Sequence, residues 1–222
     1  MRLWICSENY REDIPLSEDI LKNVSQAYRN IRNSLRFQIG NLHDFDPSAD
    51  TVAFGEMDAL DRRALAETSL LVDGVGRSFD KYEFHAACQT LIRFCANTLS
   101  ATYHDILKDR LYTLAPDDPL RRSSQTALHA VCDILCRLLS PLLPFTADEA
   151  YSHLHHGEDF HPDGVHLAQW PAREPDWEAA PEAATVRRLL AIKGTHANPA
   201  LERARSEKEI ASSLDASLTV SG

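Results

Sequence analysis

The chain has 222 residues, of which 44% are hydrophobic and 25% charged, and its formal net charge at pH 7 is −10. This length and composition are typical of a globular protein with a substantial core. No apolar run approaches the roughly 18 residues of a membrane span, so we expect no membrane partner. The acidic charge argues against a strong, free-standing nucleic-acid-binding domain, which is usually basic. It does not exclude a local surface that binds a polyanion.

The first element in chain order is a predicted helix over residues 18–39. Ser17 is a good N-cap, because its hydroxyl can accept a free backbone N–H, and Gly40 is placed to end the helix. Apolar side chains recur at three- and four-residue steps, which predicts one buried stripe. The stripe consists of Leu21, Val24, Tyr28, Ile31 and Leu35.

The same helix carries a purely basic face. The stretch "AYRNIRNSLRFQIGNL", residues 27–42, contains Arg29, Arg32 and Arg36 and no acid. These arginines follow the helical rhythm on a face that the core stripe does not use. Because an arginine guanidinium binds two phosphate oxygens at once, we favour a phosphate-bearing partner for this ridge.

Further helices follow a loop that is rich in Asn, Asp and Pro. We predict helices over residues 56–79 and from 80 onward, with Tyr82 pointing inward and a break at 97–100. Another is expected from residue 120, broken at Pro141 and Pro144. A short helix over 145–154 is predicted to begin with a capping box of Thr146 and Glu149.

The character of the sequence changes after residue 154. Residues 155–164 form a polar loop, and 165–171 alternate weakly, as an extended segment would. An amphipathic helix is expected over 182–210, interrupted around 194–199, and 213–220 have a strand-like composition. The predicted fold is therefore mainly α: a helical bundle over 15–154 with a small α/β appendage over 155–222.

Further basic residues admit two interpretations. Lys108 and Arg110 flank Asp109, and Arg121 and Arg122 are adjacent. They are either solvated ion pairs on a bundle surface or phosphate contacts, with Asp109 orienting one of the cations near it.

The histidines and cysteines give weaker signals. Several histidines could bind zinc, but no two of them are four residues apart on a helix, so we favour a solvated loop. They are His153, His155, His156, His161 and His166. The cysteines lack a C-x-x-C pair, which predicts reduced, buried thiols in a cytoplasmic protein rather than a disulfide or metal role. They are Cys6, Cys88, Cys95, Cys132 and Cys136.

Motifs of catalysis are missing from the sequence. "DGVGRSF" lacks the third glycine and the preceding strand of a phosphate loop, and neither G-x-S-x-G nor H-E-x-x-H occurs. We therefore predict no catalytic residues and no metal ligands in this chain.

Long strings of the sequence resemble the region that follows the catalytic domain in bacterial-type isoleucyl-tRNA synthetase, a class I aminoacyl-tRNA synthetase. They are "RLWICSENYREDIPLSEDILKNVSQAYRNIRNSLRFQIGNLHDFDP", "YEFHAACQTLIRFCANTLSATYHDILKDRLYTL", "RRSSQTALHAVCDILCRLLSPLLPFTADEAY" and "VHLAQWP". The tail "ALERARSEKEIASSLDASLTV" is similar to the next segment, although Ala211 stands where the family pattern has glycine.

The resemblance implies an anticodon-binding helical bundle whose partner is isoleucine tRNA. Residues 1–14 would be a linker from the catalytic domain. The HIGH- and KMSKS-type motifs, the editing domain and the cysteine-rich zinc tail are not among these residues. The chain is then expected to need no cofactor and to bind no DNA. ATP-dependent aminoacylation would belong to the remainder of a longer synthetase, which is the other expected partner.

The resemblance also directs the choice of RNA contacts. First come the basic ridge and nearby polar groups, and second the basic residues of the appendage. The first set is Arg29, Arg32, Asn33, Arg36, Lys108 and Arg110, followed by Arg121 and Arg122; the second is Lys193, Arg203, Arg205 and Lys208. Phe37, Tyr112 and Trp170 are candidates for stacking on unpaired bases, although a core role is the simpler interpretation of each.

Two alternatives remain on the sequence alone. A free-standing, synthetase-like helical module could bind another protein rather than tRNA, as the acidic charge mildly favours. A metalloenzyme built on the histidine-rich loop is the weaker alternative.

Overall fold

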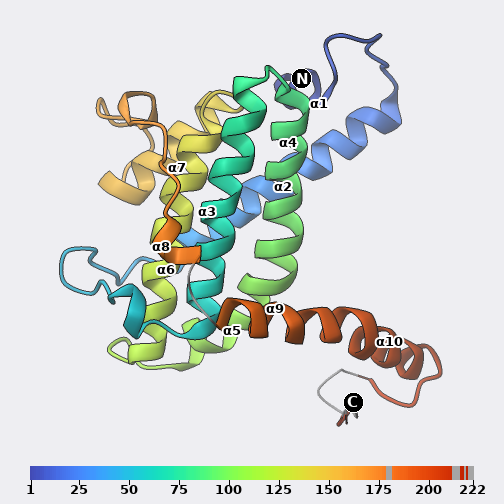
Figure 1. Cartoon of the computed structure of the whole chain (residues 1–222), viewed down its shortest axis with the longest axis vertical. Coiled ribbons are helices and arrows are strands. Elements are labelled where there is room, and N and C mark those ends of the chain that lie inside the picture. Colours follow the sequence, from blue (N-terminus) through green and yellow to red (C-terminus); the bar gives the residue numbers. More distant parts are fainter. Residues whose placement is uncertain (179–181, 212–215, 218, 220–222) are drawn as a thin grey trace. The chain divides into compact units, whose positions relative to one another are not determined.

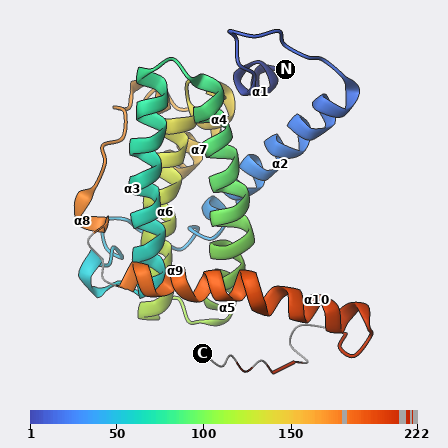
Figure 2. The same cartoon turned by 45° about the vertical axis from the view of Figure 1, so that its right-hand side comes forward.

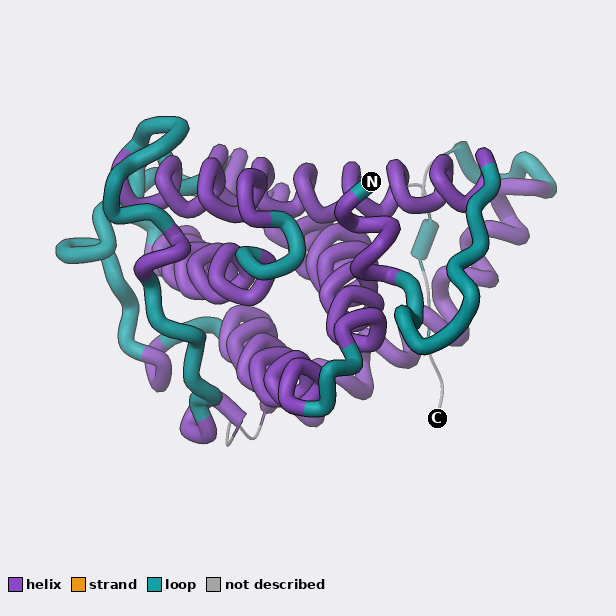
Figure 3. The backbone as a smooth tube through the Cα atoms, turned by 90° about the horizontal axis from the view of Figure 1, so that it is seen from above, coloured by secondary structure: helices purple, strands orange, loops and turns teal. Residues whose placement is uncertain are grey.

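The computed structural model describes residues 1–178, 182–211, 216–217 and 219. Its internal contacts divide the chain into two compact units, Met1–Ala180 and Pro181–Gly222. The described part is helical or irregular, with no strand, so the prediction of a mainly α bundle is confirmed (Figure 3).

The elements of the first unit are α1 (Arg2–Ser7), α2 (Glu18–Gly40), the 3₁₀ turn η1 (Phe54–Glu56), α3 (Ala59–Asp80), α4 (Phe84–Arg93), the π-helical η2 (Phe94–Tyr103), α5 (His104–Thr113), α6 (Pro119–Leu139), α7 (Pro144–His156), the 3₁₀ turn η3 (Val165–Leu167) and α8 (Pro175–Glu178). The second unit contains α9 (Glu182–Ile192), the π-helical η4 (Lys193–Ala197) and α10 (Asn198–Ser206).

The first unit is a bundle with one helix laid across it. Helix α3 packs against α4 and α6, and α6 packs against α7. Figures 1 and 2 show α3, α4 and α6 running side by side, whereas α2 crosses the bundle obliquely. Helix α2 packs against η2, α6 and α7, and Ile31 and Leu35 in its C-terminal half are almost fully buried. Leu21, Val24 and Tyr28 are only half-buried, so the predicted stripe is fully covered only toward its C-terminal end.

The ends of α2 follow the sequence. The Ser17 side chain accepts a hydrogen bond from the backbone N–H of Ile20 at 3.2 Å, which confirms the predicted N-cap. The helix ends at Gly40, and Asn41 follows with its amide donating to the carbonyl of Phe37. The exposed basic face is therefore carried on a helix whose two ends are both fixed.

Several local predictions are wrong. Helix α7 begins at Pro144 rather than after Thr146, and the Thr146 hydroxyl lies 3.1 Å from the hydroxyl of Tyr28 instead of capping the helix. Tyr82 is 64% exposed and has a positive φ of 59°, because it lies in the turn between α3 and α4. Instead of a break at 97–100, a π-helical segment joins α4 to α5.

The appendage differs from its predicted outline. Residues 165–171 contain a 3₁₀ turn where we expected an extended segment, and residues 213–220 lie largely outside the described part. The interruption around 194–199 is a π-helical turn between α9 and α10. The first compact unit extends past residue 154, where Ser69 of α3 holds the backbone of Glu174 and the side chain of Glu178 through hydrogen bonds. The domain division itself stays a prediction.

The cysteines lie as predicted for reduced thiols. All five are free, and all are buried except Cys6, which is half-buried. Burial raises the pKa of Cys95 to about 12, which makes this thiol unreactive near neutral pH. Within the described residues, no helix combines the length and apolarity needed to cross a membrane.

Candidate nucleic-acid interface

The predicted basic ridge on α2 is exposed. Arg29, Arg32 and Arg36 all present their side chains to solvent, and no acid in the described part of the chain forms an ion pair with any of them. Arg29 makes one long contact, 3.4 Å to the side-chain oxygen of Gln26. These guanidinium groups are therefore available to an anionic partner.

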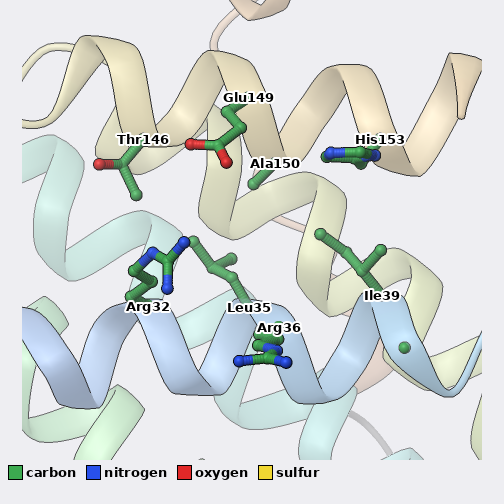
Figure 4. A pocket seen from close by; sticks show the side chains of 9 residues that line it. Arg32, Leu35, Arg36, Ile39, Thr146, Glu149, Ala150 and His153 are labelled. Carbon is green, nitrogen blue, oxygen red and sulfur yellow. The ribbon is translucent and has the colours of Figure 1, made fainter. Parts of the chain in front are cut away.

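The ridge borders hollows on both flanks of α2. Arg29 and Arg32 line a broad hollow of about 800 Å³ beside α1, together with Tyr28. Arg32 and Arg36 line a second hollow of about 300 Å³ between α2 and α7, which we call the α2–α7 hollow (Figure 4). Arg36 also lines a third hollow of about 380 Å³ toward Tyr112 of α5, which we call the α2–α5 hollow.

The α2–α5 hollow brings together groups suited to an unpaired nucleotide. It is lined by Asn33, Arg36, Phe37, Gly40, Asn41 and Tyr112. Tyr112 is 65% exposed, so its ring offers a face for base stacking. The Asn33 amide can both donate to and accept from a base edge, and the Arg36 guanidinium can bind a phosphate. The sequence named Asn33, Arg36, Phe37 and Tyr112 separately, and the fold places them around one hollow.

A buried histidine supports one wall of this hollow. The Phe37 ring stacks on the imidazole of His104, with centroids 4.4 Å apart and an angle of 23° between the planes. Burial, with a smaller contribution from the charge of Lys108, lowers the pKa of His104 to about 3. His104 is therefore neutral at physiological pH and acts as an apolar support for Phe37.

Arg110 faces the interior of the bundle. Its guanidinium lies 2.9 Å from a carboxylate oxygen of Asp58 and 3.4 Å from one of Asp61. Asp61 is fully buried and also accepts hydrogen bonds from the hydroxyls of Tyr103 and Ser123, each at 2.6 Å. Burial raises the pKa of Asp61, while those hydrogen bonds and Arg110 oppose the rise. Arg110 is thus engaged in holding the fold, which does not support its predicted RNA contact.

Arg121 and Arg122 are likewise paired within the fold. Arg121 is 8% exposed and donates to the carbonyl of Leu111 and, at 2.9 Å, to Asp44. Arg122 lies 3.8 Å from Asp44 and 3.4 Å from Asp50. Burial raises the pKa of Asp44, but hydrogen bonds from Gln125 and Arg121 outweigh it and lower the pKa overall. This cluster fixes the loop after α2, and we leave both arginines out of the interface.

Lys108 is exposed on α5, one helical turn before Tyr112. Its ammonium lies 3.0 Å from Asp105, so the predicted orienting role of Asp109 is wrong for both Lys108 and Arg110. The Lys108–Asp105 pair is a surface pair with both side chains about half exposed, and such pairs contribute little to stability. Lys108 therefore stays a predicted RNA contact, although it is not among the residues that line the α2–α5 hollow.

The predicted contacts of the second unit are all exposed. Lys193 lies in η4, Arg203 and Arg205 in the last turn of α10, and Lys208 just after it. Arg205 forms an ion pair with Glu202 at 2.6 Å. Their role stays a prediction that concerns the second unit alone.

The predicted histidine loop is only partly a loop, because His153, His155 and His156 lie in the last turn of α7, which ends at His156. His153 Nε2 lies 2.8 Å from Asp159, His155 Nε2 lies 2.9 Å from Asp133, and His156 stacks on His161. Glu149, His153 and Asp159 place potential metal-ligand atoms within 4.8 Å of one another. Glu149 and His153 are four residues apart on α7, a pairing that a search for histidine pairs misses. The absence of a metal site stays a prediction.

Trp170 is separate from the ridge and its hollows. Its ring packs edge-on against Phe79, with centroids 5.3 Å apart, and it is 43% exposed. It lines another hollow with Asp133 and Arg137 of α6. The positions of Phe37 and Tyr112 beside the α2 ridge therefore fit a role in stacking on RNA bases. For Trp170, only the residue type fits that role.

Comparison with known proteins places this helical bundle among tRNA ligase domains. Residues 61–220 match the model of the family described as the anticodon-binding domain of tRNA ligase. The chain belongs to this family. This membership favours the tRNA interpretation over the free-standing protein-interaction module.

The curated relatives narrow the resemblance further. The chain is similar to an isoleucine–tRNA ligase of Desulfotalea psychrophila, with 48% identity over 225 residues. Enzymes of the same name from Moorella thermoacetica and Geobacter sulfurreducens are 43% identical over 218 residues and 39% identical over 220. These matches cover 98–100% of this chain and 23–24% of each relative, so the chain spans about a quarter of their length. They include α2 and its ridge, which precede the matched family region.

Proposed function

We propose that this chain binds the anticodon stem-loop of isoleucine tRNA and contributes tRNA recognition to an isoleucine–tRNA ligase. The observation that carries the proposal is the junction of the exposed arginine ridge with the α2–α5 hollow at Arg36. The ridge attracts and holds the RNA backbone, while Asn33 and Tyr112 receive an unstacked base.

The acidic net charge of the chain is consistent with RNA binding at the α2 ridge alone. A net charge of −10 opposes nonspecific attachment of polyanions over most of the surface. The exposed arginines on α2 form a cationic strip, and a strip of this kind orients an RNA backbone along one path. Association should therefore depend strongly on salt and on the ridge.

Catalysis of aminoacylation belongs, in this proposal, to other parts of a longer synthetase. Those parts supply the ATP and isoleucine sites, and this chain requires no cofactor of its own for RNA binding. We propose that the protein acts in the cytoplasm, because its five cysteines are free thiols, as is usual in that compartment.

A titration with isoleucine tRNA and one noncognate tRNA tests the proposal, at about 50 mM and 200 mM salt. We expect tighter binding of the isoleucine tRNA and a loss of affinity of one or more orders of magnitude across this salt range. Circular dichroism of the same sample establishes that the protein is folded. Absence of binding to either tRNA by a folded sample at low salt would contradict the proposal.

A further inference from the structure

The α2–α7 hollow has two walls of opposite chemistry. Arg32 and Arg36 of α2 form one wall, and Glu149 and His153 of α7 form the other. Figure 4 shows Arg32 and Glu149 extending into the space between the two helices. Leu35, Ile39 and Ala150 supply apolar surface within the hollow. A volume of about 300 Å³ with a partly apolar lining is sufficient for one nucleobase.

The two hollows lie on opposite flanks of the same helix segment. Arg36 and Gly40 line both the α2–α7 hollow and the α2–α5 hollow. Gly40 is exposed and presents no side chain between them. A phosphate bound by Arg36 would therefore have one nucleotide on either side, each next to a hollow that can receive its base.

Glu149 gives the α2–α7 hollow a chemical preference. The residue is half-buried, and no Lys or Arg of the described residues forms an ion pair with it. An ionised carboxylate only accepts hydrogen bonds, so it favours a base that presents an amino group. Cytosine presents an amino group at the position where uracil presents a carbonyl oxygen, which a carboxylate repels.

We propose that the α2–α7 hollow is a second nucleotide subsite, in which Glu149 selects a base carrying an exocyclic amino group and Arg32 and Arg36 hold its phosphate. The inference rests on the proposed binding of RNA along α2, and it adds a position and a base preference to it. Glu149 is here a specificity-determining residue, and nothing in the sequence patterns singled it out for that role.

The matched pyrimidine nucleotides CMP and UMP test this inference, because they differ at the group that Glu149 would contact. Each is titrated into the ¹⁵N-labelled chain by NMR, with EDTA present so that no metal ion bridges the phosphate to Glu149, His153 and Asp159. We expect CMP to shift the signals of Arg32, Arg36, Glu149 and His153 and to bind about three- to tenfold more tightly than UMP, the ratio that one hydrogen bond gives.

Two variants complete the test. Glu149→Gln should bring the CMP-to-UMP affinity ratio close to one, because an amide both donates and accepts. Glu158→Gln, at an exposed loop position, is the matched control and should leave the ratio unchanged. Equal binding of CMP and UMP by the unmodified chain, or shifts confined to other residues, would overturn the inference. The absence of any shift up to about 20 mM nucleotide would also overturn the inference, because it would mean a dissociation constant well above this concentration.

Failure of this inference differs from failure of the proposed function. If isoleucine tRNA binds in a salt-dependent manner while CMP and UMP do not differ, the RNA-binding proposal stands and the amino-selective subsite is wrong. If a folded sample binds no tRNA at low salt, the proposed function itself is wrong, whatever the nucleotides do.

Discussion

The arginines of α2 and those of α5 and α6 look alike in the sequence but have opposite environments in the fold. Arg29, Arg32 and Arg36 are exposed and have no acidic partner among the described residues, whereas Arg110 and Arg121 are engaged with buried or half-buried aspartates. A paired, buried cation holds the structure together, and an unpaired, exposed one is available to a ligand. The difference separates residues that maintain this bundle from residues that are available to a partner.

The largest effect on stability is expected from a substitution in the interior, at Asp61. Asp61→Ala removes the acceptor of the Tyr103 and Ser123 hydroxyls and one of the two carboxylates that pair with Arg110, the other being Asp58. Loss of one partner of a buried ion pair typically costs about 3–5 kcal/mol, so the free energy of unfolding should fall by this amount in urea denaturation. Tyr103→Phe is the milder companion and should cost about 1–2 kcal/mol. An Asp61→Ala variant as stable as the unmodified chain would remove the distinction between the two groups of arginines.

The next largest effect concerns the pH dependence of stability through His104. Its pKa is about 3 in the folded chain and about 6.5 when unfolded, so the unfolded state binds more protons between these values. Stability is therefore lost as pH falls below 6.5, by about 2 kcal/mol from this group at pH 5.

His104→Gln should remove that part of the pH dependence. The measurement is urea denaturation at pH 7 and pH 5 for the unmodified chain, for His104→Gln and for the exposed-site control His166→Gln. A difference between pH 7 and pH 5 that is the same in all three proteins would show that His104 is not a buried neutral support.

A smaller effect on binding is expected at the α2–α5 hollow. Tyr112→Ala removes a 65% exposed ring that the core does not need, so stability should change by less than about 0.5 kcal/mol. Affinity for isoleucine tRNA should fall about tenfold, the lower part of the range for loss of one base-stacking contact. Tyr112→Phe retains the ring and should bind almost as well. Equal loss in both variants would indicate that the hydroxyl, rather than stacking, makes the contact.

The smallest effects on stability and binding are predicted for Lys108, which is exposed like the ridge arginines but has an acidic partner like the interior ones. Its ion pair with Asp105 is exposed, so Lys108→Ala should change the free energy of unfolding by less than about 0.5 kcal/mol. If Lys108 contacts a phosphate, the slope of log affinity against log salt should fall by roughly one unit. An unchanged slope would place Lys108 outside the interface.

The sequence predicts the helices of this protein better than the roles of its charges. Ser17, Gly40 and the prolines between α6 and α7 act through local backbone chemistry, so their effects are readable from neighbouring residues. The pairing of Arg110 with Asp58 and Asp61 joins residues about 50 positions apart, so no local sequence pattern predicts it. Thr146 shows the converse, since its local capping signal is overridden by a contact with Tyr28 from a distant helix.

The candidate site was predictable in part for the same reason. The absence of acids from residues 27–42 indicated that Arg29, Arg32 and Arg36 have no partner close to them in their own helix, and the fold supplies none in its described part. The grouping of Asn33, Arg36 and Phe37 with Tyr112 depends on the packing of α2 beside α5. Asn41, which shares that hollow, gave no signal beyond its place at the end of the helix.

The central claim is that the α2 ridge, and not exposed positive charge in general, binds the RNA. The direct measurement compares isoleucine tRNA binding across a salt series for the unmodified chain, for Arg29/Arg32/Arg36→Ala, and for the control Arg77/Lys81/Arg93→Ala. The control removes the same charge from exposed positions at the α3–α4 end of the bundle and on α4. The account predicts that the ridge variant stays folded, loses roughly two to three units of salt slope and binds about 100-fold more weakly at low salt, while the control changes little. Equal losses in both variants, or unchanged binding by the folded ridge variant, would contradict it.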